Sequence, residues 1–168
     1  GHPLDNEAIT RGTSIYVADR VVPMLPFELS NGICSLNPNV ERLVLTVTMD
    51  VDSMGNVFSS KIERGVIRSH GRLTYNQVND FFEGKEVDLS EEIKDTLLIL
   101  HEASLAIRKR RHMQGSLTLD STELKFHLDE NGMPTSVTKQ GQGDSEKLIE
   151  DMMVIAHCTI ATQPRKTR

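Results

Sequence analysis

The acidic residues Asp50 and Asp52 are the first that could do chemistry, because they stand two positions apart as ligands do in a calcium-binding loop. Such a loop also needs an oxygen ligand at the position of Met54 and a bidentate glutamate at the position of Lys61. Neither residue can supply one. We therefore predict a hairpin turn at residues 52–56 and no metal site there.

Two glycines, Gly141 and Gly143, precede an expected helix, as in a dinucleotide-binding fingerprint. The third glycine of that fingerprint is replaced by Glu146, and Asp144 adds a second carboxylate at the same helix start. Two carboxylates would repel a phosphate at this position. The segment therefore predicts a loop that leads into a helix, and not a nucleotide site.

Basic residues gather in two short runs, 108–112 and 165–168. Binding to a nucleic acid depends on clustered Lys and Arg, because each neutralised phosphate releases counterions. The formal net charge of the chain is −5, which does not by itself indicate a nucleic-acid-binding protein. Only the two local basic runs are compatible with binding to a nucleic acid.

Composition is that of an ordinary globular domain, with 168 residues, 38% apolar and 26% charged. No apolar run approaches the length of about 20 residues needed to cross a bilayer, and the first residues do not resemble a signal peptide. Cys34 and Cys158 are far apart and lack the spacing of a zinc site. We expect a cytoplasmic protein with reduced thiols and no membrane partner.

Residues 12–36 form the stretch around which the other elements are organised. Pro23 and Pro26 restrict the residues before them to extended conformations. We predict a strand at Val21–Val22, a sharp turn, and a short helix from Phe27 to Ser30 that Asn31–Gly32 closes.

Alternating and helical patterns predict the remaining elements. Helices are expected at 6–11 with Asp5 as cap, at 75–83 with a Thr74–Gln77 capping box, from Ser90 to Gly115, and from Asp144 onward. Strands are expected at 43–51 and 57–68 as a hairpin, and at 117–119, 124–128 and 135–139. The mixture predicts an α+β fold, an antiparallel or mixed sheet flanked by helices.

The segments Arg11–Leu36, Ser69–Tyr75 and Glu146–Met153 together resemble the catalytic domain of the ribonuclease R and ribonuclease II family. The resemblance extends over roughly Leu4 to Ala156 and implies one partial catalytic domain over residues 1–168. Members of this family are magnesium-dependent exoribonucleases. They degrade single-stranded RNA from the 3′ end to nucleoside 5′-monophosphates, so the resemblance implies single-stranded RNA as the partner.

The resemblance also implies roles for individual residues. Tyr16 matches an aromatic that stacks on bases, although a tyrosine of this kind can also be packed in a core. Tyr75 matches a tyrosine that lines the catalytic pocket, although a packing role is equally compatible with its place in a helix. Glu150 matches an acid that holds the terminal ribose, although a solvated glutamate beside Lys147 is the alternative.

Some positions depart from the family pattern. Leu119 stands where an aromatic usually completes the base clamp, and His157 replaces an asparagine in the last helix. The aspartates that hold magnesium lie upstream of residues 12–36 in the family, and nothing before Asp5 supplies them. We expect metal ligands and catalytic residues to be absent from this chain, and the chain alone to be inactive. A non-catalytic RNA-binding or interaction module from a truncated gene is the alternative.

Overall fold

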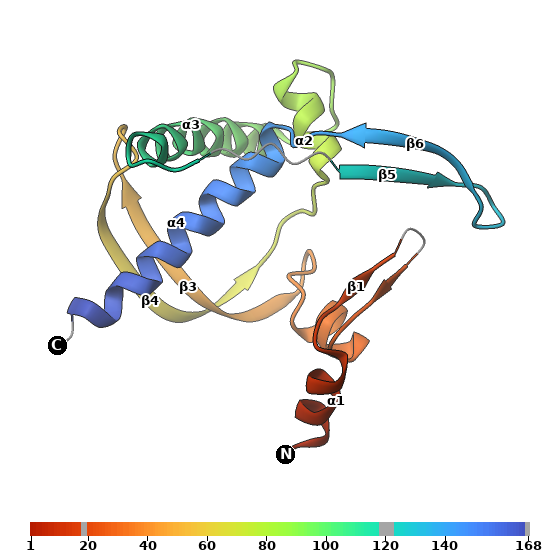
Figure 1. Ribbon diagram of the computed structural model, residues 1–168. Coiled ribbons are helices and arrows are strands. Elements are labelled where there is room, and N and C mark those ends of the chain that lie inside the picture. Colours follow the sequence, from red (N-terminus) through yellow and green to blue (C-terminus); the bar gives the residue numbers. More distant parts are fainter. Residues whose placement is uncertain (18–19, 118–122, 167–168) are drawn as a thin grey trace. The chain divides into compact units, whose positions relative to one another are not determined.

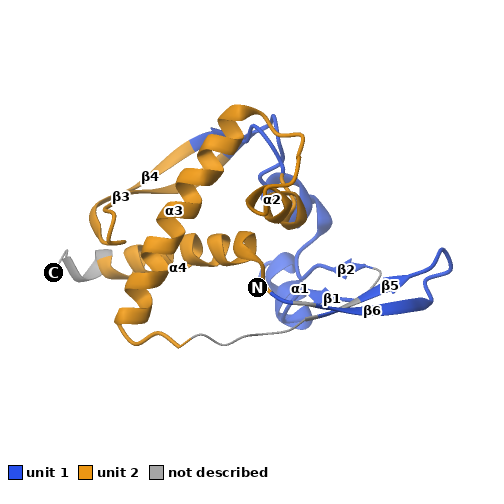
Figure 2. Ribbon diagram, turned by 90° about the horizontal axis from the view of Figure 1, so that it is seen from above, with its two compact units in different colours: residues 1–42, 66–72, 122–141 blue, residues 43–65, 73–121, 142–168 orange. Residues whose placement is uncertain are grey.

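The computed structural model describes residues 1–17, 20–117 and 123–166 (Figure 1). These residues form two compact units (Figure 2). The first unit consists of residues 1–42, 66–72 and 122–141, and the second of residues 43–65, 73–121 and 142–168. Helices accompany two-stranded sheets throughout, which confirms the predicted α+β class.

Helix α1 (Pro3–Arg11) opens the first unit, three residues earlier than predicted. Its cap is His2, whose Nδ1 accepts a hydrogen bond from the Leu4 amide at 3.2 Å, so the prediction of Asp5 as cap was wrong. Proline at the first helical position explains the earlier start, because its fixed φ suits that position and its missing N–H costs nothing there. Gly12, with φ 72°, ends the helix as predicted.

Strands β1 (Ile15–Tyr16) and β2 (Val21–Val22) form a short antiparallel hairpin in which Tyr16 pairs with Val21. The strand predicted at Val21–Val22 is therefore confirmed. Two side chains tie the segment that follows to the start of the unit. The Ser14 hydroxyl accepts from the Met24 amide at 3.0 Å, and Arg11 donates to the Pro23 carbonyl at 2.9 Å.

A π-helix, η1 (Glu28–Ile33), follows the second proline and continues past Asn31–Gly32, where we had predicted its end. Arg42 explains the extra length. Its guanidinium donates to the carbonyl of Ser35 at 2.9 Å and to that of Gly32 at 3.3 Å, and so satisfies acceptors at the end of the helix.

Strands β5 (Glu123–Leu128) and β6 (Pro134–Gln140) complete the first unit as an antiparallel hairpin, as predicted. Asp129 closes the turn, since one of its oxygens accepts from the amides of Asn131 and Met133. Of the strand predicted at 117–119, Leu117 is not in a strand and the other residues lie outside the described part of the chain.

The second unit contains most of a long hairpin, β3 (Glu41–Val51) and β4 (Val57–Arg68), joined by the predicted turn at 52–56. Gly55 in this turn has φ 78°, and a Cβ there would lie 2.7 Å from the Ala106 carbonyl oxygen. Only glycine allows so close an approach of the turn to the third helix. Arg110 fixes the contact by donating to the Gly55 carbonyl at 3.2 Å.

Helices α2 (Tyr75–Phe82), α3 (Glu91–Met113) and α4 (Asp144–Lys166) form the rest of this unit. The Thr74–Gln77 capping box and the Ser90 cap are present as predicted. The buried apolar side chains are Val78, Leu97, Ile107, Leu148 and Ile155. Ile149, on the flank of the α4 stripe that contains Leu148 and Ile155, is 51% exposed. Among the described residues, no helix is both long and apolar enough to cross a membrane.

Candidate functional site

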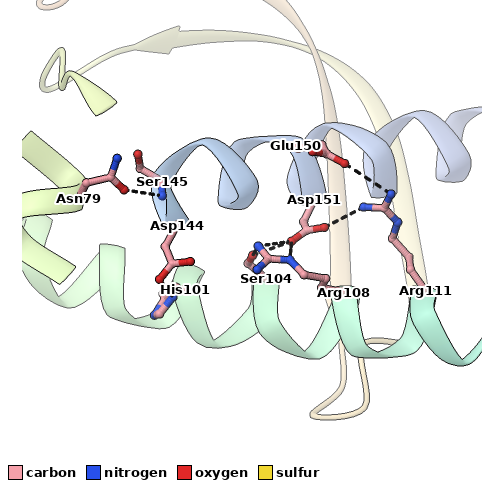
Figure 3. Close-up of polar contacts among 9 residues, drawn as sticks. All are labelled: Asn79, His101, Ser104, Arg108, Arg111, Asp144, Ser145, Glu150 and Asp151. Carbon is pink, nitrogen blue, oxygen red and sulfur yellow. Dashed lines mark hydrogen bonds and ion pairs between the residues drawn. The ribbon is translucent and has the colours of Figure 1, made fainter. Parts of the chain in front are cut away.

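The start of α4 is joined to α2 by a small set of hydrogen bonds, of which Figure 3 shows the one between Asn79 and Ser145. Asn79 accepts from the Ser145 amide at 2.9 Å, which satisfies one of the free donors at the helix start. The Ser145 hydroxyl lies 3.1 Å from the Tyr75 carbonyl oxygen and 2.9 Å from Glu146 Oε2, and its single proton is shared between these two acceptors. The backbone of Tyr75 is therefore held at a fixed place relative to α4.

Glu146 is the acidic member of this junction. Partial burial raises the pKa of Glu146. Hydrogen bonds from the Asn79 side chain, the backbone and the Ser145 hydroxyl lower the pKa by more than burial raises it, so the net pKa lies below its usual value. The Asn79 amide nitrogen donates to Glu146 Oε2 at 3.0 Å. The negative charge of Glu146 also suits the positive end of the helix dipole.

A cavity of about 160 Å³ lies where α2, α3 and α4 meet, and Tyr75 is part of its lining. The other lining residues are Leu73, Thr74, Val78, Leu97, Leu100, Ser145, Leu148 and Ile149. Tyr75 is half exposed, so its ring is also open to solvent. The structure thus places Tyr75 at a mainly apolar cavity, and its role in a catalytic pocket stays a prediction.

A buried ionic network joins α3 to the middle of α4 (Figure 3). Its centre is Asp151, which is 1% exposed. Asp151 Oδ2 accepts from the Ser104 hydroxyl at 2.8 Å and from Arg108 Nε at 2.9 Å. Asp151 Oδ1 accepts from Arg111 Nη1 at 2.8 Å. Both carboxylate oxygens are therefore satisfied, as a buried charge requires.

Glu150 precedes Asp151 and lies at the edge of the same network. Its Oε1 is 3.6 Å from Arg111 Nη2, and its side chain is 45% exposed. Arg111 therefore meets two acids at once, one buried and one partly open to solvent. The sequence pattern had placed Glu150 beside Lys147 on its own helix, whereas the structure pairs it across to α3.

The basic run at 108–112 does not form an unoccupied cluster for nucleic acid. Arg108 and Arg111 contact Asp151, and Arg110 contacts the Gly55 carbonyl. Lys109 is exposed. Three arginines of this run are therefore engaged within the protein, and RNA binding by the run stays a prediction.

The remaining predicted site residues are Tyr16, Leu119 and His157. Tyr16 is 79% exposed on β1, so it is not a packed core tyrosine. Leu119 lies outside the described residues. His157 is exposed on α4. Tyr16 belongs to the first unit, and Tyr75 and Glu150 to the second, where the structure attaches both to the same helix, α4.

A family model for the RNB domain matches residues 1–167. The chain belongs to this family. Ribonuclease R 1 of Lactococcus lactis is 43% identical over 165 residues, which cover 95% of this chain and 20% of that protein. Ribonuclease R of Escherichia coli is 37% identical over 169 residues, which cover 99% of this chain and 21% of that protein.

Solved structures agree with the family assignment. Mycoplasma genitalium RNase R in complex with double-stranded RNA has a TM-score of 0.90 and 30% identity, covering 99% of this chain and 30% of that one. The same enzyme in complex with ribose-methylated single-stranded RNA has a TM-score of 0.89 and covers 26% of that chain. The chain thus spans less than a third of the relatives it matches.

The described acids of this RNB chain do not fit a magnesium ion. The described residues contain no group of three or more His, Cys, Asp or Glu that could hold a metal. Asp52 accepts from the side chain and backbone of Asn56 and from the Met54 amide, which lowers its pKa and engages both oxygens in the turn. Asp151 is engaged by two arginines.

Sequence reasoning missed the role of Asp151. A signal for it was present, because Ser104, Arg108 and Arg111 recur at spacings of four and three on one face of the predicted helix. Polar residues in a stripe that also contains core leucines need a buried partner. The last helix offers such a partner in Asp151, one turn from the buried Leu148.

Proposed function

We propose that this chain is part of a 3′-to-5′ exoribonuclease that hydrolyses single-stranded RNA to nucleoside 5′-monophosphates. The observation that carries the proposal is the RNB family match over residues 1–167. The relatives that support it include proteins named ribonuclease R from several bacteria, and the similar RNase R of Mycoplasma genitalium has been solved with RNA.

In this proposal Tyr16 stacks on the bases of the RNA. Its exposure of 79% on a short hairpin leaves the ring accessible to a ligand. A stack of a base on an aromatic ring contributes about 1–3 kcal/mol and is independent of sequence, because every base has a π face. This suits an enzyme that removes each nucleotide in turn.

Tyr75 and Glu150 act at the 3′ end of the RNA in the same proposal. Tyr75 lines the cavity between α2, α3 and α4, and Glu150 offers a partly exposed carboxylate that can accept hydrogen bonds from ribose hydroxyls. The 2′-hydroxyl is the group that distinguishes RNA from DNA. A carboxylate at this place therefore favours RNA.

Magnesium is the metal we propose for hydrolysis, held by residues other than the described acids. Asp52 and Asp151 are already engaged by the protein itself, as shown above. We therefore expect the isolated 168-residue chain to be inactive with magnesium. When bound in the enzyme, the ion would stabilise charge on the scissile phosphate and activate water.

A gel assay with single-stranded RNA labelled at its 5′ end tests the proposal. The complete gene product that contains these residues should shorten the RNA stepwise from the 3′ end with magnesium. The isolated chain, assayed beside it, should leave the RNA intact.

An unlabelled DNA strand of the same sequence serves as competitor and should inhibit less than RNA does. Cleavage inside the RNA, or no cleavage at all by the complete gene product, would contradict the proposal. Binding without cleavage by the complete product would favour the alternative of a non-catalytic RNA-binding module.

A further inference from the structure

Arg111 is the residue through which the buried network reaches Glu150. We propose that Arg111 is a positioning residue that orients the Glu150 carboxylate toward the terminal ribose of bound RNA. This inference rests on the proposed function and adds to it a residue that does not itself touch the RNA. The structure supports it by the contacts of Arg111, by its anchoring, and by the contrast with Arg108.

The guanidinium of Arg111 is anchored on its buried side. Its Nη1 lies 2.8 Å from Asp151 Oδ1, and Asp151 is 1% exposed. Asp151 is itself fixed by Ser104 and Arg108 through its other oxygen. Because a guanidinium is planar and rigid, fixing one nitrogen limits where the other nitrogens can lie.

The second terminal nitrogen of Arg111 lies next to Glu150. The distance from Nη2 to Glu150 Oε1 is 3.6 Å, and the Glu150 side chain is 45% exposed. A glutamate on a helix surface otherwise samples several rotamers. An anchored cation beside Oε1 favours the rotamers that keep this oxygen near α3. We assign Oε2 as the acceptor for the ribose hydroxyl.

Arg108 provides a matched control on the same helix. It contacts the same buried acid, with Nη2 2.8 Å from Asp151 Oδ2, and it donates to the Ser104 hydroxyl at 3.2 Å. These contacts of Arg108, with Asp151 and Ser104, lie within the network, whereas Arg111 also reaches Glu150. A purely structural role of the network predicts equal effects for both arginines, whereas a positioning role predicts a much larger effect of Arg111 than of Arg108.

The test measures how well the complete gene product discriminates between two RNA ends. Binding is measured without divalent metal for an oligoadenylate that ends in adenosine and for one that ends in 2′-deoxyadenosine. A hydrogen bond from a hydroxyl to a carboxylate predicts about tenfold tighter binding of the first. Glu150→Gln should reduce this ratio, because it removes the charged acceptor.

Arg111→Lys should reduce the ratio of the two affinities to the level of Glu150→Gln. A lysine is a flexible point charge and cannot span two acids as a guanidinium does. Arg108→Lys should reduce the ratio much less, because Ser104 still holds Asp151 and Arg111 still contacts Glu150. The double variant Arg111→Lys/Glu150→Gln should lose no more than Glu150→Gln alone, because both changes act on one contact. Melting temperatures of all variants separate these effects from loss of folding.

If Glu150→Gln reduces the ratio and Arg111→Lys does not, the inference is wrong and the ribose contact stands. If both lysine variants reduce the ratio equally, the network acts only as structural support and the inference is also wrong. A ratio that Glu150→Gln does not change overturns the ribose contact together with the inference. Failure of the gene product to bind either RNA overturns the proposed function itself.

Discussion

The hairpin β1–β2 and the helix pair α3–α4 each present candidate RNA contacts, but they hold them in different ways. Tyr16 lies on a two-residue strand whose side chains are exposed. Glu150 lies beside an acid that is 1% exposed and is bound by two arginines and a serine. The first contact depends on local backbone structure, and the second on tertiary packing.

This difference matches the chemistry we propose for the two sites. Stacking tolerates small displacements, because a ring can slide over a base face with little loss. A hydrogen bond from a ribose hydroxyl to a carboxylate requires a defined distance and direction. A residue with such a requirement is best placed on a rigid element with supporting contacts. The buried network around Asp151 is a support of this kind.

The comparison between the two regions predicts its largest effect on stability at Asp151. Asp151→Asn removes the negative charge between Arg108 and Arg111, so two partly buried cations lose their partner. We expect the free energy of unfolding to fall by about 2–4 kcal/mol. Denaturant unfolding followed by circular dichroism measures it.

Glu91→Gln is the matched control, because Glu91 forms an ion pair with Lys94 on the same helix while 84% exposed. It should cost at most about 0.5 kcal/mol. Equal losses for the two variants would show that the buried network contributes no more than a surface pair.

A smaller effect is expected at the α2–α4 junction. Asn79→Ala removes the acceptor for the Ser145 amide and the donor to Glu146. Loss of a helix cap of this type costs about 1–2 kcal/mol. Thermal unfolding of Asn79→Ala beside Asn56→Ala, which removes one hydrogen bond to Asp52 in the β3–β4 turn, would check the value. A melting temperature equal to that of the wild type would contradict the role of Asn79 as a cap.

The pH dependence of this junction gives a still smaller signal. Because the folded-state pKa of Glu146 is lowered from 4.5, its contribution to stability is complete above that value. The contribution is lost as pH falls through the folded pKa. Between about pH 6 and about pH 3, the wild type should therefore lose more unfolding free energy than Asn79→Ala does. Parallel pH profiles would show that Asn79 does not stabilise the Glu146 carboxylate.

The smallest effect on stability is expected at the hairpin. Tyr16 is 79% exposed, so Tyr16→Ala should change the free energy of unfolding by no more than about 0.5 kcal/mol. Val78→Ala, at a buried position of α2, should lower it clearly in the same denaturant titration. A large loss in Tyr16→Ala would mean that Tyr16 packs against the protein and is not held open for a ligand.

Much of this fold could be predicted from local sequence signals. The Thr74–Gln77 capping box, the Ser90 cap and the strands at 43–51 and 57–68 follow rules that depend on a few neighbouring residues. One error, at α1, arose from the neighbouring residues His2 and Pro3, which set an earlier helix start. The other arose where a side chain farther along the chain decided the outcome. Arg42 extends the π-helix past Gly32 by binding carbonyls ten and seven residues away.

The candidate site was less predictable. Resemblance to the family supplied Tyr16, Tyr75 and Glu150, but it could not show which basic residues were already engaged. The contact between Arg111 and Asp151 joins residues 40 positions apart, and no local pattern specifies such a pair. Charge counts treat Arg108 and Arg111 as available to RNA, whereas the structure pairs both of them with Asp151.

The most direct test of the account is the affinity of the complete gene product for single-stranded RNA, measured without divalent metal for the wild type and Tyr16→Ala. Loss of a base stack of about 1–3 kcal/mol predicts binding that is weaker by roughly 5- to 150-fold, with an unchanged melting temperature. Equal affinities, or a wild type that does not bind RNA, would contradict the claim that this RNB chain contacts RNA through its exposed hairpin.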